Sequence, residues 1–191
     1  MAAKSTGRLR IVAGKWRGRW IDVPEAAARG CVRPVTTRVR EAIFSALGRE
    51  RIETSQGLDL FAGSGSSGLE ALSRGAQHVT FVEQDGETCA CLKRNISLLS
   101  AESSCCVLQQ DALAYVLHAG DAKYDLIFVD PPYALRLSED FWQRLSGFFQ
   151  IEGLAVVRCH KQFPPHLPDG YTTVWQRCYG DMLVLFVCMK R

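Results

Sequence analysis

The sequence predicts an α/β protein with a mostly parallel central sheet that has helices on both faces. From about residue 57 onward, short apolar runs alternate with helical stretches, which is the pattern of repeated strand–helix units. The apolar runs are nearly continuous, as is typical of strands that are buried on both faces. Two late runs, 171–180 and 182–190, meet at a tight Gly180-Asp181 link, which predicts an antiparallel C-terminal hairpin.

The first 55 residues predict a small appendage in front of this domain. Residues 8–14 and 19–24 alternate in polarity around a glycine-containing link, so we expect a β-hairpin. Residues 33–50 have helical periodicity, with Thr36 or Thr37 as the cap. Arg38 and Arg40 are expected to lie away from the apolar face, which consists of Val39, Ile43, Phe44 and Leu47. We therefore divide the chain into an appendage, 1–55, and a main α/β domain, 56–191.

The domain itself is expected to contain five strands before the final hairpin. Each of the first four is followed by a helix, in the order strand 57–61 and helix 67–76, strand 78–85 and helix 86–100, strand 105–111 and helix 112–120, strand 124–129 and helix 138–149. The fifth strand is 153–160. The connection 161–170 contains three prolines, so we expect no crossover helix there. The sequence does not determine where the late strands insert.

Composition is that of a cytoplasmic globular protein. The chain has 191 residues, of which 47% are hydrophobic and 23% charged. No apolar run is long enough for a signal peptide or a membrane span. The eight cysteines include no C-x-x-C pair, and we interpret them as reduced core thiols. Together with the four histidines they lack the spacing of a metal site, so we expect no metal. We also expect a monomer.

Basic charge is concentrated at the front of the chain. Residues 1–55 hold 12 Lys+Arg and 5 Asp+Glu, a net +7, whereas residues 56–191 hold 11 and 15, a net −4. Such a segment suits contact with phosphates, and a solubilising face would explain it equally well.

A glycine loop follows the first strand of the domain. Gly63, Gly65 and Gly68 have the spacing G-x-G-x-x-G between a strand and a helix, which lets the backbone approach a ligand closely. The ligand could be a dinucleotide or S-adenosylmethionine. Asp59 favours the second, because a carboxylate suits an ammonium and a sulfonium and is unfavourable beside a pyrophosphate.

The next two strand ends each carry a carboxylate. Glu83 can accept hydrogen bonds from both ribose hydroxyls of either ligand, or be a solvated strand-end glutamate. Asp111 can accept from an adenine amino group, and can also cap the helix that begins at Ala112. These two roles of Asp111 are compatible, since a carboxylate has several acceptor sites.

The fourth strand ends in Asp130-Pro131-Pro132-Tyr133, a rigid turn with an acceptor on one side and an aromatic ring on the other. An exocyclic amine on a planar base has its lone pair delocalised into the ring. Asp130 and the Pro131 carbonyl can accept its two N–H groups and draw the nitrogen toward a tetrahedral shape. Tyr133 can stack on the base, a contact typically worth about 1–3 kcal/mol. The alternative is a turn that merely ends a strand.

The ordered set "LDLFAGSG", "FVEQD", "QQDAL" and "IFVDPPY" resembles class I S-adenosylmethionine-dependent methyltransferases that act on exocyclic amines. The segments "RIVAGKWRGRWIDVP", "RPVTTRVREAIFSAL" and "GLEALSRGA" narrow the resemblance to the RsmD family, which methylates the N2 amine of a guanine in bacterial 16S rRNA. The resemblance covers nearly the whole chain and implies a Rossmann-like class I methyltransferase fold.

The resemblance also implies the roles of individual residues. The cofactor would contact Asp59, Phe61, Ala62, Gly63, Ser64, Gly65, Glu83, Asp111 and Ala112. The guanine would contact Asp130, Pro131, Pro132 and Tyr133. The substrate would be 16S rRNA in an assembled or assembling 30S subunit. Its phosphates would contact Arg8, Arg10, Lys15, Arg17, Arg19, Arg33, Arg38 and Arg40.

Three alternatives remain open from the sequence. The first is a methyltransferase acting on adenine N6 or cytosine N4 in DNA or other RNA, or on a protein glutamine. The second is an NAD-dependent oxidoreductase, which would leave Asp130-Pro131-Pro132-Tyr133 without a task. The third is an rRNA-binding assembly factor without catalysis.

Overall fold

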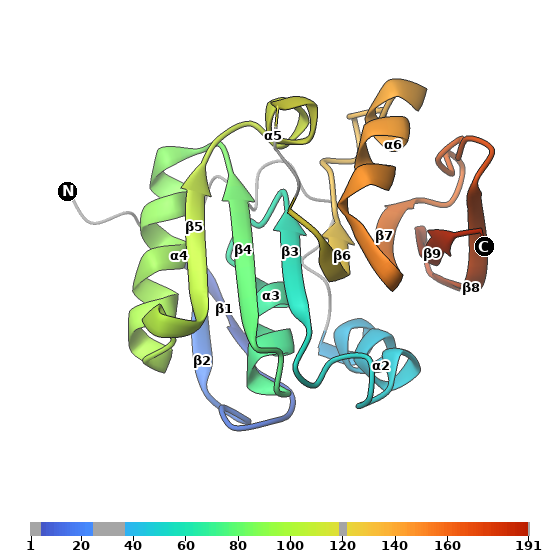
Figure 1. Ribbon diagram of the computed structural model, residues 1–191. Coiled ribbons are helices and arrows are strands. Elements are labelled where there is room, and N and C mark those ends of the chain that lie inside the picture. The colour runs from blue at the N-terminus through green and yellow to red at the C-terminus, as the bar shows by residue number, and fades with distance from the viewer. Residues whose placement is uncertain (1–4, 25–36, 119–121, 191) are drawn as a thin grey trace.

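A computed structural model describes residues 5–24, 37–118 and 122–190 and contains a seven-stranded sheet (Figure 1). The strands lie in the order β5-β4-β3-β6-β7-β9-β8. Their bounds are β3 Gln56–Leu60, β4 His78–Glu83, β5 Cys105–Gln109, β6 Tyr124–Val129, β7 Phe149–His160, β8 Tyr171–Tyr179 and β9 Met182–Met189. The first five are parallel, and β9 is antiparallel to both β7 and β8. The predicted fold class and the antiparallel C-terminal hairpin are confirmed.

The order of the late strands follows from their burial. The last strand, β9, inserts between β7 and β8, and its consecutive residues Val184 to Val187 are buried on both faces of the sheet. In contrast, β8 is an edge strand and exposes Val174. In the described chain the proline-containing connection 161–170 has no helix, as expected.

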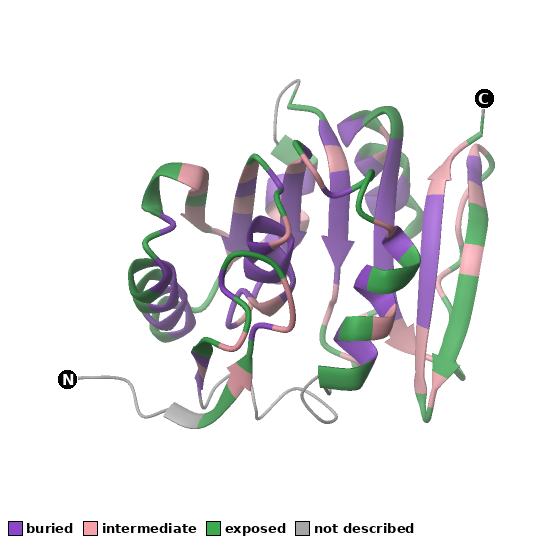
Figure 2. Cartoon of the chain, turned by 90° about the horizontal axis from the view of Figure 1, so that it is seen from below, coloured by how far each residue is buried: buried purple, intermediate pink, exposed green. Residues whose placement is uncertain are grey.

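Helices cover both faces of the sheet, and the buried residues gather in the strands and in the inward sides of the helices (Figure 2). One face packs against α2 Thr37–Leu47, α3 Ser66–Ser73 and α4 Gly86–Leu99. The other packs against α5 Ala112–His118 and α6 Glu139–Leu145. Two short 3-10 turns, η1 Glu102–Ser104 and η2 Ser146–Phe148, precede β5 and β7.

The N-terminal hairpin is present and packs on the domain. Strands β1 Ser5–Arg10 and β2 Trp20–Pro24 pair antiparallel, and β2 lies against α4. Ile11, Trp16 and Ile21 belong to the same buried cluster as the sheet residues Val79 and Phe81. The hairpin therefore shares a core with the domain, while the boundary at residue 55 stays a prediction.

One prediction about the helix 37–47 is wrong. Val39, Ile43, Phe44 and Leu47 are buried as expected, but Arg40 is also buried, with 2% of its surface exposed. Its guanidinium lies 3.6 Å from the carboxylate of Glu70 and donates to the carbonyl of Arg10. Burial lowers the pKa of Arg40, and Glu70 opposes that shift. Arg40 is thus a structural cation rather than an RNA contact. Arg33 and Thr36 lie outside the described residues.

Cysteines and membrane-spanning segments can be assessed for the described residues only. The seven cysteines among them are free; Cys89 and Cys91 are buried, whereas Cys106 and Cys178 are exposed, so the expectation of core thiols holds for only part of the set. Within the same ranges no helix is long and apolar enough to cross a membrane, and no group of three or more His, Cys, Asp or Glu side chains could hold a metal ion.

Candidate active site

The predicted site residues lie at one edge of the sheet, where the parallel strands end. The chain runs outward from β3 to β4 and β5, then returns to place β6 and β7 on the other side of β3. The order of strands therefore reverses between β3 and β6, which is where open α/β sheets bind ligands. The loop after β3 and the Asp130 turn after β6 flank this point.

The loop after β3 has an unusual backbone. Phe61, Gly63 and Gly65 all have positive φ, of 59°, 56° and 77°. A Cβ on Gly63 would meet no neighbour nearer than 4.0 Å, whereas a Cβ on Gly68 would lie 2.3 Å from the ring of Phe81. The absence of a side chain therefore serves a different purpose at each glycine. Gly63 leaves open space at the loop surface, and Gly68 allows α3 to pack closely on the sheet. The left-handed Phe61 is a strained residue of the kind that gathers at functional sites.

Asp59 anchors the helix that follows this loop. Its side chain is 2% exposed, and its Oδ2 accepts a hydrogen bond of 2.9 Å from the backbone N–H of Gly68. Burial raises the pKa of Asp59 to about 7, opposed by the Gly68 hydrogen bond and by the charge of Arg158. The site therefore contains a desolvated carboxylate beside the glycine loop, which would become more stable in its charged form if a cation bound nearby.

Glu83 holds the same loop from β4. Its Oε2 accepts from the N–H of Gly63 and its Oε1 from the N–H of Asp85, both at 2.9 Å. Each carboxylate oxygen retains a further acceptor direction, so these bonds are compatible with binding ribose hydroxyls. Glu83 is therefore a bonded part of the site rather than a solvated strand end.

Asp111 caps α5, as one of its two interpretations predicted. Its Oδ1 accepts from the N–H of Ala114 at 2.8 Å, and α5 begins at Ala112. The second carboxylate oxygen can still accept from another donor.

Asp130 is paired with an arginine that sequence reasoning did not identify. Arg158, near the end of β7, donates from Nη2 to Asp130 Oδ2 and lies 3.4 Å from Ser67 Oγ on α3. Desolvation raises the pKa of Asp130, and the charge and hydrogen bond of Arg158 oppose that shift. Nothing in a single sequence pairs these residues, because the register of β6 and β7 brings them together.

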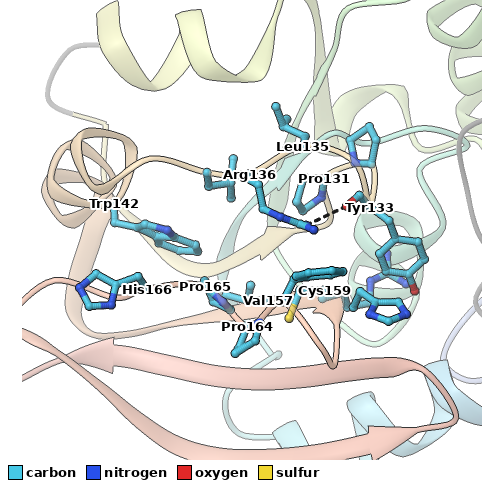
Figure 3. Close-up of a pocket in the computed structure, with 15 residues that line it drawn as sticks. Pro131, Tyr133, Leu135, Arg136, Trp142, Val157, Cys159, Pro164, Pro165 and His166 are labelled. Carbon is cyan, nitrogen blue, oxygen red and sulfur yellow. Dashed lines mark hydrogen bonds between the residues drawn. The ribbon is translucent and has the colours of Figure 1, made fainter.

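A pocket of about 240 Å³ lies beside the Asp130 turn (Figure 3). The turn forms one wall through Pro131 and Tyr133, and the segment 163–166 after β7 forms another. Tyr133 meets His160 edge-on at 5.9 Å, and the Arg136 guanidinium lies 4.0 Å from the ring centre of Phe163. The pocket is thus aromatic and cationic, a combination suited to a nucleotide.

Trp142 also lines this pocket, and its indole N–H is buried. The side chain is fully buried, and its indole N–H has no hydrogen-bond partner among the described residues. The aromatic residues of the segment after β7 were not identified from the sequence. Their only signal was the proline-rich connection that replaces a helix.

Two buried polar residues join the N-terminal hairpin to the domain, and one of them also reaches the glycine loop. Asn95 of α4 donates to the carbonyl of Ser64 in the glycine loop, and it exchanges hydrogen bonds with the backbone of Asp22 in β2. Glu70 of α3 accepts from the N–H groups of Val12 and Ala13. Neither was identified from the sequence, because their partners in the hairpin region lie more than 50 positions away.

The predicted RNA-contact residues spread over a long surface. Among the described ones, Arg38 of α2 is exposed. Five basic side chains of the hairpin are also exposed: Arg8, Arg10, Lys15, Arg17 and Arg19. The hairpin turn lies at the C-terminal end of α3, where the N–H of Lys15 donates to the carbonyl of Ser73. That end of the molecule is opposite the strand ends of the candidate site (Figure 1). Lys15 and Arg17, which belong to this turn, therefore lie away from Asp130.

The strand order, the glycine loop and the Asp-Pro-Pro-Tyr turn together define the class: this is a methyltransferase of the α/β type. The solved structure of the Escherichia coli protein yhhF superposes with a TM-score of 0.82 and 32% identity, covering 96% of this chain and 99% of that one. Within the class, the chain belongs to the family described as Conserved hypothetical protein 95, whose model matches residues 9–188. The resemblance to the RsmD family is confirmed.

Curated relatives agree over most of the length. Ribosomal RNA small subunit methyltransferase D of Escherichia coli is 38% identical over 180 residues, which cover 93% of this chain and 88% of the relative. The protein of the same name from Haemophilus influenzae is 35% identical over 178 residues, covering 91% and 90%.

Proposed function

We propose that this protein transfers a methyl group from S-adenosylmethionine to the exocyclic N2 amine of a guanine in 16S rRNA. The observation that carries the proposal is the Asp130 carboxylate, which lies at the switch point of the sheet and is linked through Arg158 to Ser67 of the helix that follows the glycine loop. An rRNA substrate is supported by the names of the relatives, which are small subunit rRNA methyltransferases.

The residues around the glycine loop fit the cofactor. Gly63 leaves space that a side chain would fill, Asp59 offers a buried carboxylate for an ammonium, and Glu83 retains acceptor sites for ribose hydroxyls. Asp111 could accept from the adenine amine. The remaining cofactor contacts would come from Phe61, Ala62, Ser64, Gly65 and Ala112. When bound, S-adenosylmethionine supplies a methyl carbon made electrophilic by its attachment to a sulfonium.

Residues of the turn would prepare the amine. Asp130 and the Pro131 carbonyl accept its two N–H groups, which localises the lone pair on nitrogen. Tyr133 stacks on the guanine, and Pro132 keeps the turn rigid. The pocket beside the turn would hold the base or its neighbour. Positioning of this kind can lower the activation barrier by several kcal/mol.

The macromolecular context belongs to the same proposal. We infer that the substrate is 16S rRNA within an assembled or assembling 30S subunit, that the enzyme acts as a cytoplasmic monomer without a metal, and that residues 1–55 contact rRNA phosphates. Target bases in exposed loops suit a small enzyme, because little base pairing must be broken to extrude them.

Labelled S-adenosylmethionine and 30S particles that lack the modification provide the test. Wild-type protein should label one guanine, identified by mass spectrometry of rRNA digests. Asp130→Ala should lower the rate by at least about 100-fold and leave cofactor binding nearly intact. Absence of label with wild-type protein would favour a binding factor, and label on another base would favour one of the other amine substrates. Normal turnover by Asp130→Ala would remove the role of Asp130.

A further inference from the structure

We propose that Arg158 is a positioning residue for Asp130: it fixes the carboxylate at the end of β6 and keeps it in the charged, hydrogen-bond-accepting form. The inference rests on the proposed function, since it assigns how the acceptor of the substrate amine is maintained. It begins from an ion pair that neither the motifs nor the family names indicate.

The backbone places the two residues side by side. Strands β6 and β7 are parallel with Val129 opposite Val157, so Asp130, the first residue after β6, follows in step with Arg158 of β7. Adjacent positions on parallel neighbours point to the same face of the sheet. Arg158 is therefore set beside Asp130 by register and not by a flexible loop.

The contacts are those of a fixed pair. Arg158 Nη2 donates to Oδ2 of Asp130, and the Arg158 side chain is only 8% exposed while that of Asp130 is 28% exposed. Within the described chain no other donor meets the Asp130 carboxylate, so the pair leaves Oδ1 to accept from a substrate amine. A hydrogen bond between charged partners is stronger and more directional than one between neutral groups.

Several charged and titratable groups surround the pair. Asp59 on β3 adds negative charge when it is ionised, and the positive charges of Arg40 on α2 and Arg158 repel each other, while His160 of β7 contacts Tyr133 of the turn. Desolvation favours the neutral acid, and Arg158 is the cation whose charge and hydrogen bond oppose that shift in the pKa of Asp130. A protonated Asp130 would donate where the reaction needs an acceptor, and it could not balance the positive charge that forms on the amine.

Loss of the guanidinium should therefore appear as a change in pH dependence. An opposite charge at this range shifts the pKa of a carboxyl group by about 1–3 units. In Arg158→Gln the acidic limb of the single-turnover rate should move upward by about that much, with a loss of roughly tenfold or more at neutral pH that recovers at higher pH. Arg158→Lys keeps the charge and should stay near wild type. Arg144→Gln, which removes an exposed arginine of α6, is the matched control.

A second readout does not need catalysis. Carboxyl carbon NMR, assigned with Asp130→Asn, should show Asp130 titrating higher in Arg158→Gln than in wild type. In wild-type protein the Arg158 guanidinium nitrogens should shift with the same midpoint as Asp130, which keeps the test valid even if a variant does not fold.

The outcomes are distinct. Failure of wild-type protein to methylate would count against the proposed function, and the NMR titration would still decide the pairing. The inference is overturned if Arg158→Gln loses activity equally at every pH, if it keeps full activity, or if the Asp130 midpoint does not move. It is overturned too if the Arg158 nitrogens do not sense the Asp130 titration.

Discussion

Asp59 is a single carboxyl group through which pH should act on the stability of the fold. Its pKa of about 7 in the folded protein is above the ordinary value of 3.8, so the native state holds this proton more tightly than the unfolded chain. The stabilisation of the fold that comes from this proton is fully present below about pH 4 and is lost as pH rises through about 7. The free energy of unfolding falls over that range by up to about 4 kcal/mol.

We therefore expect Asp59→Asn to flatten the dependence of the free energy of unfolding on pH between about pH 4 and pH 7. The uncharged amide should also make the ligand-free protein more stable than wild type above that range, while cofactor affinity falls. Urea unfolding at several pH values measures the effect, with the exposed Asp140→Asn as the control. Parallel curves for wild type and Asp59→Asn would contradict the prediction.

Alanine substitutions at two glycines of the same motif should affect packing in one case and cofactor binding in the other. A methyl group on Gly68 would lie 2.3 Å from the Phe81 ring, so Gly68→Ala should lower the free energy of unfolding by about 1–3 kcal/mol. Gly63→Ala meets open space and should cost only about 1–2 kcal/mol for its positive φ, but it should weaken cofactor binding. Thermal melts with and without cofactor measure both, and Gly147→Ala, with no neighbour within 4 Å, is the control. Equal losses of stability and binding in both variants would show that the division is wrong.

At the scale of elements, the periodicity of the sequence predicted the strands and helices well, because burial on both faces of a parallel sheet leaves a continuous apolar run. It did not predict that Arg40 is buried. Periodicity shows which face of a helix is apolar, but an arginine next to that face can be buried when a distant carboxylate accepts it. The roles of Asn95 and Arg158 were not predicted for the same reason: they arise from contacts between elements, which one sequence does not encode locally. The strand-end carboxylates were predictable, because each closes its own strand.

Glu70 is the residue on which the hairpin's attachment depends. It is fully buried, accepts from Val12 and Ala13, pairs with Arg74 at 2.8 Å, and is the counter-charge of Arg40. Glu70→Gln should cost about 3–5 kcal/mol, since it leaves a buried guanidinium without its partner.

Hydrogen exchange gives this prediction local resolution. The amides of Val12 and Ala13 should exchange faster in Glu70→Gln, beyond the general loss of stability. Glu53→Gln breaks the exposed Arg49–Glu53 pair and should cost less than about 1 kcal/mol. Unchanged protection of both amides would mean that the hairpin is held by its apolar contacts alone.

At the scale of the whole molecule, the proposed catalytic turn lies away from part of the basic charge. Asp130 lies at the ends of the parallel strands, whereas Lys15 and Arg17 lie at the hairpin turn near the end of α3, at the opposite edge (Figure 1). An RNA strand that meets both must follow the hairpin along the side of the molecule. A long footprint of this kind would favour a folded ribosomal particle over a short free RNA, because only an extended rigid surface presents phosphates at both ends.

Charge reversal at the turn tests this footprint. Lys15→Glu with Arg17→Glu should weaken binding to 30S particles and reduce the slope of log affinity against log salt by roughly one per lost phosphate contact. Methylation at saturating 30S should be nearly unchanged, because the turn is remote from Asp130, and a short RNA hairpin carrying the target loop should bind both proteins alike. Arg144→Glu on α6 changes charge on the other face of the sheet and is the control. A fall in saturated rate, or an equal loss of affinity for the short hairpin, would place the RNA on a smaller surface around the strand ends.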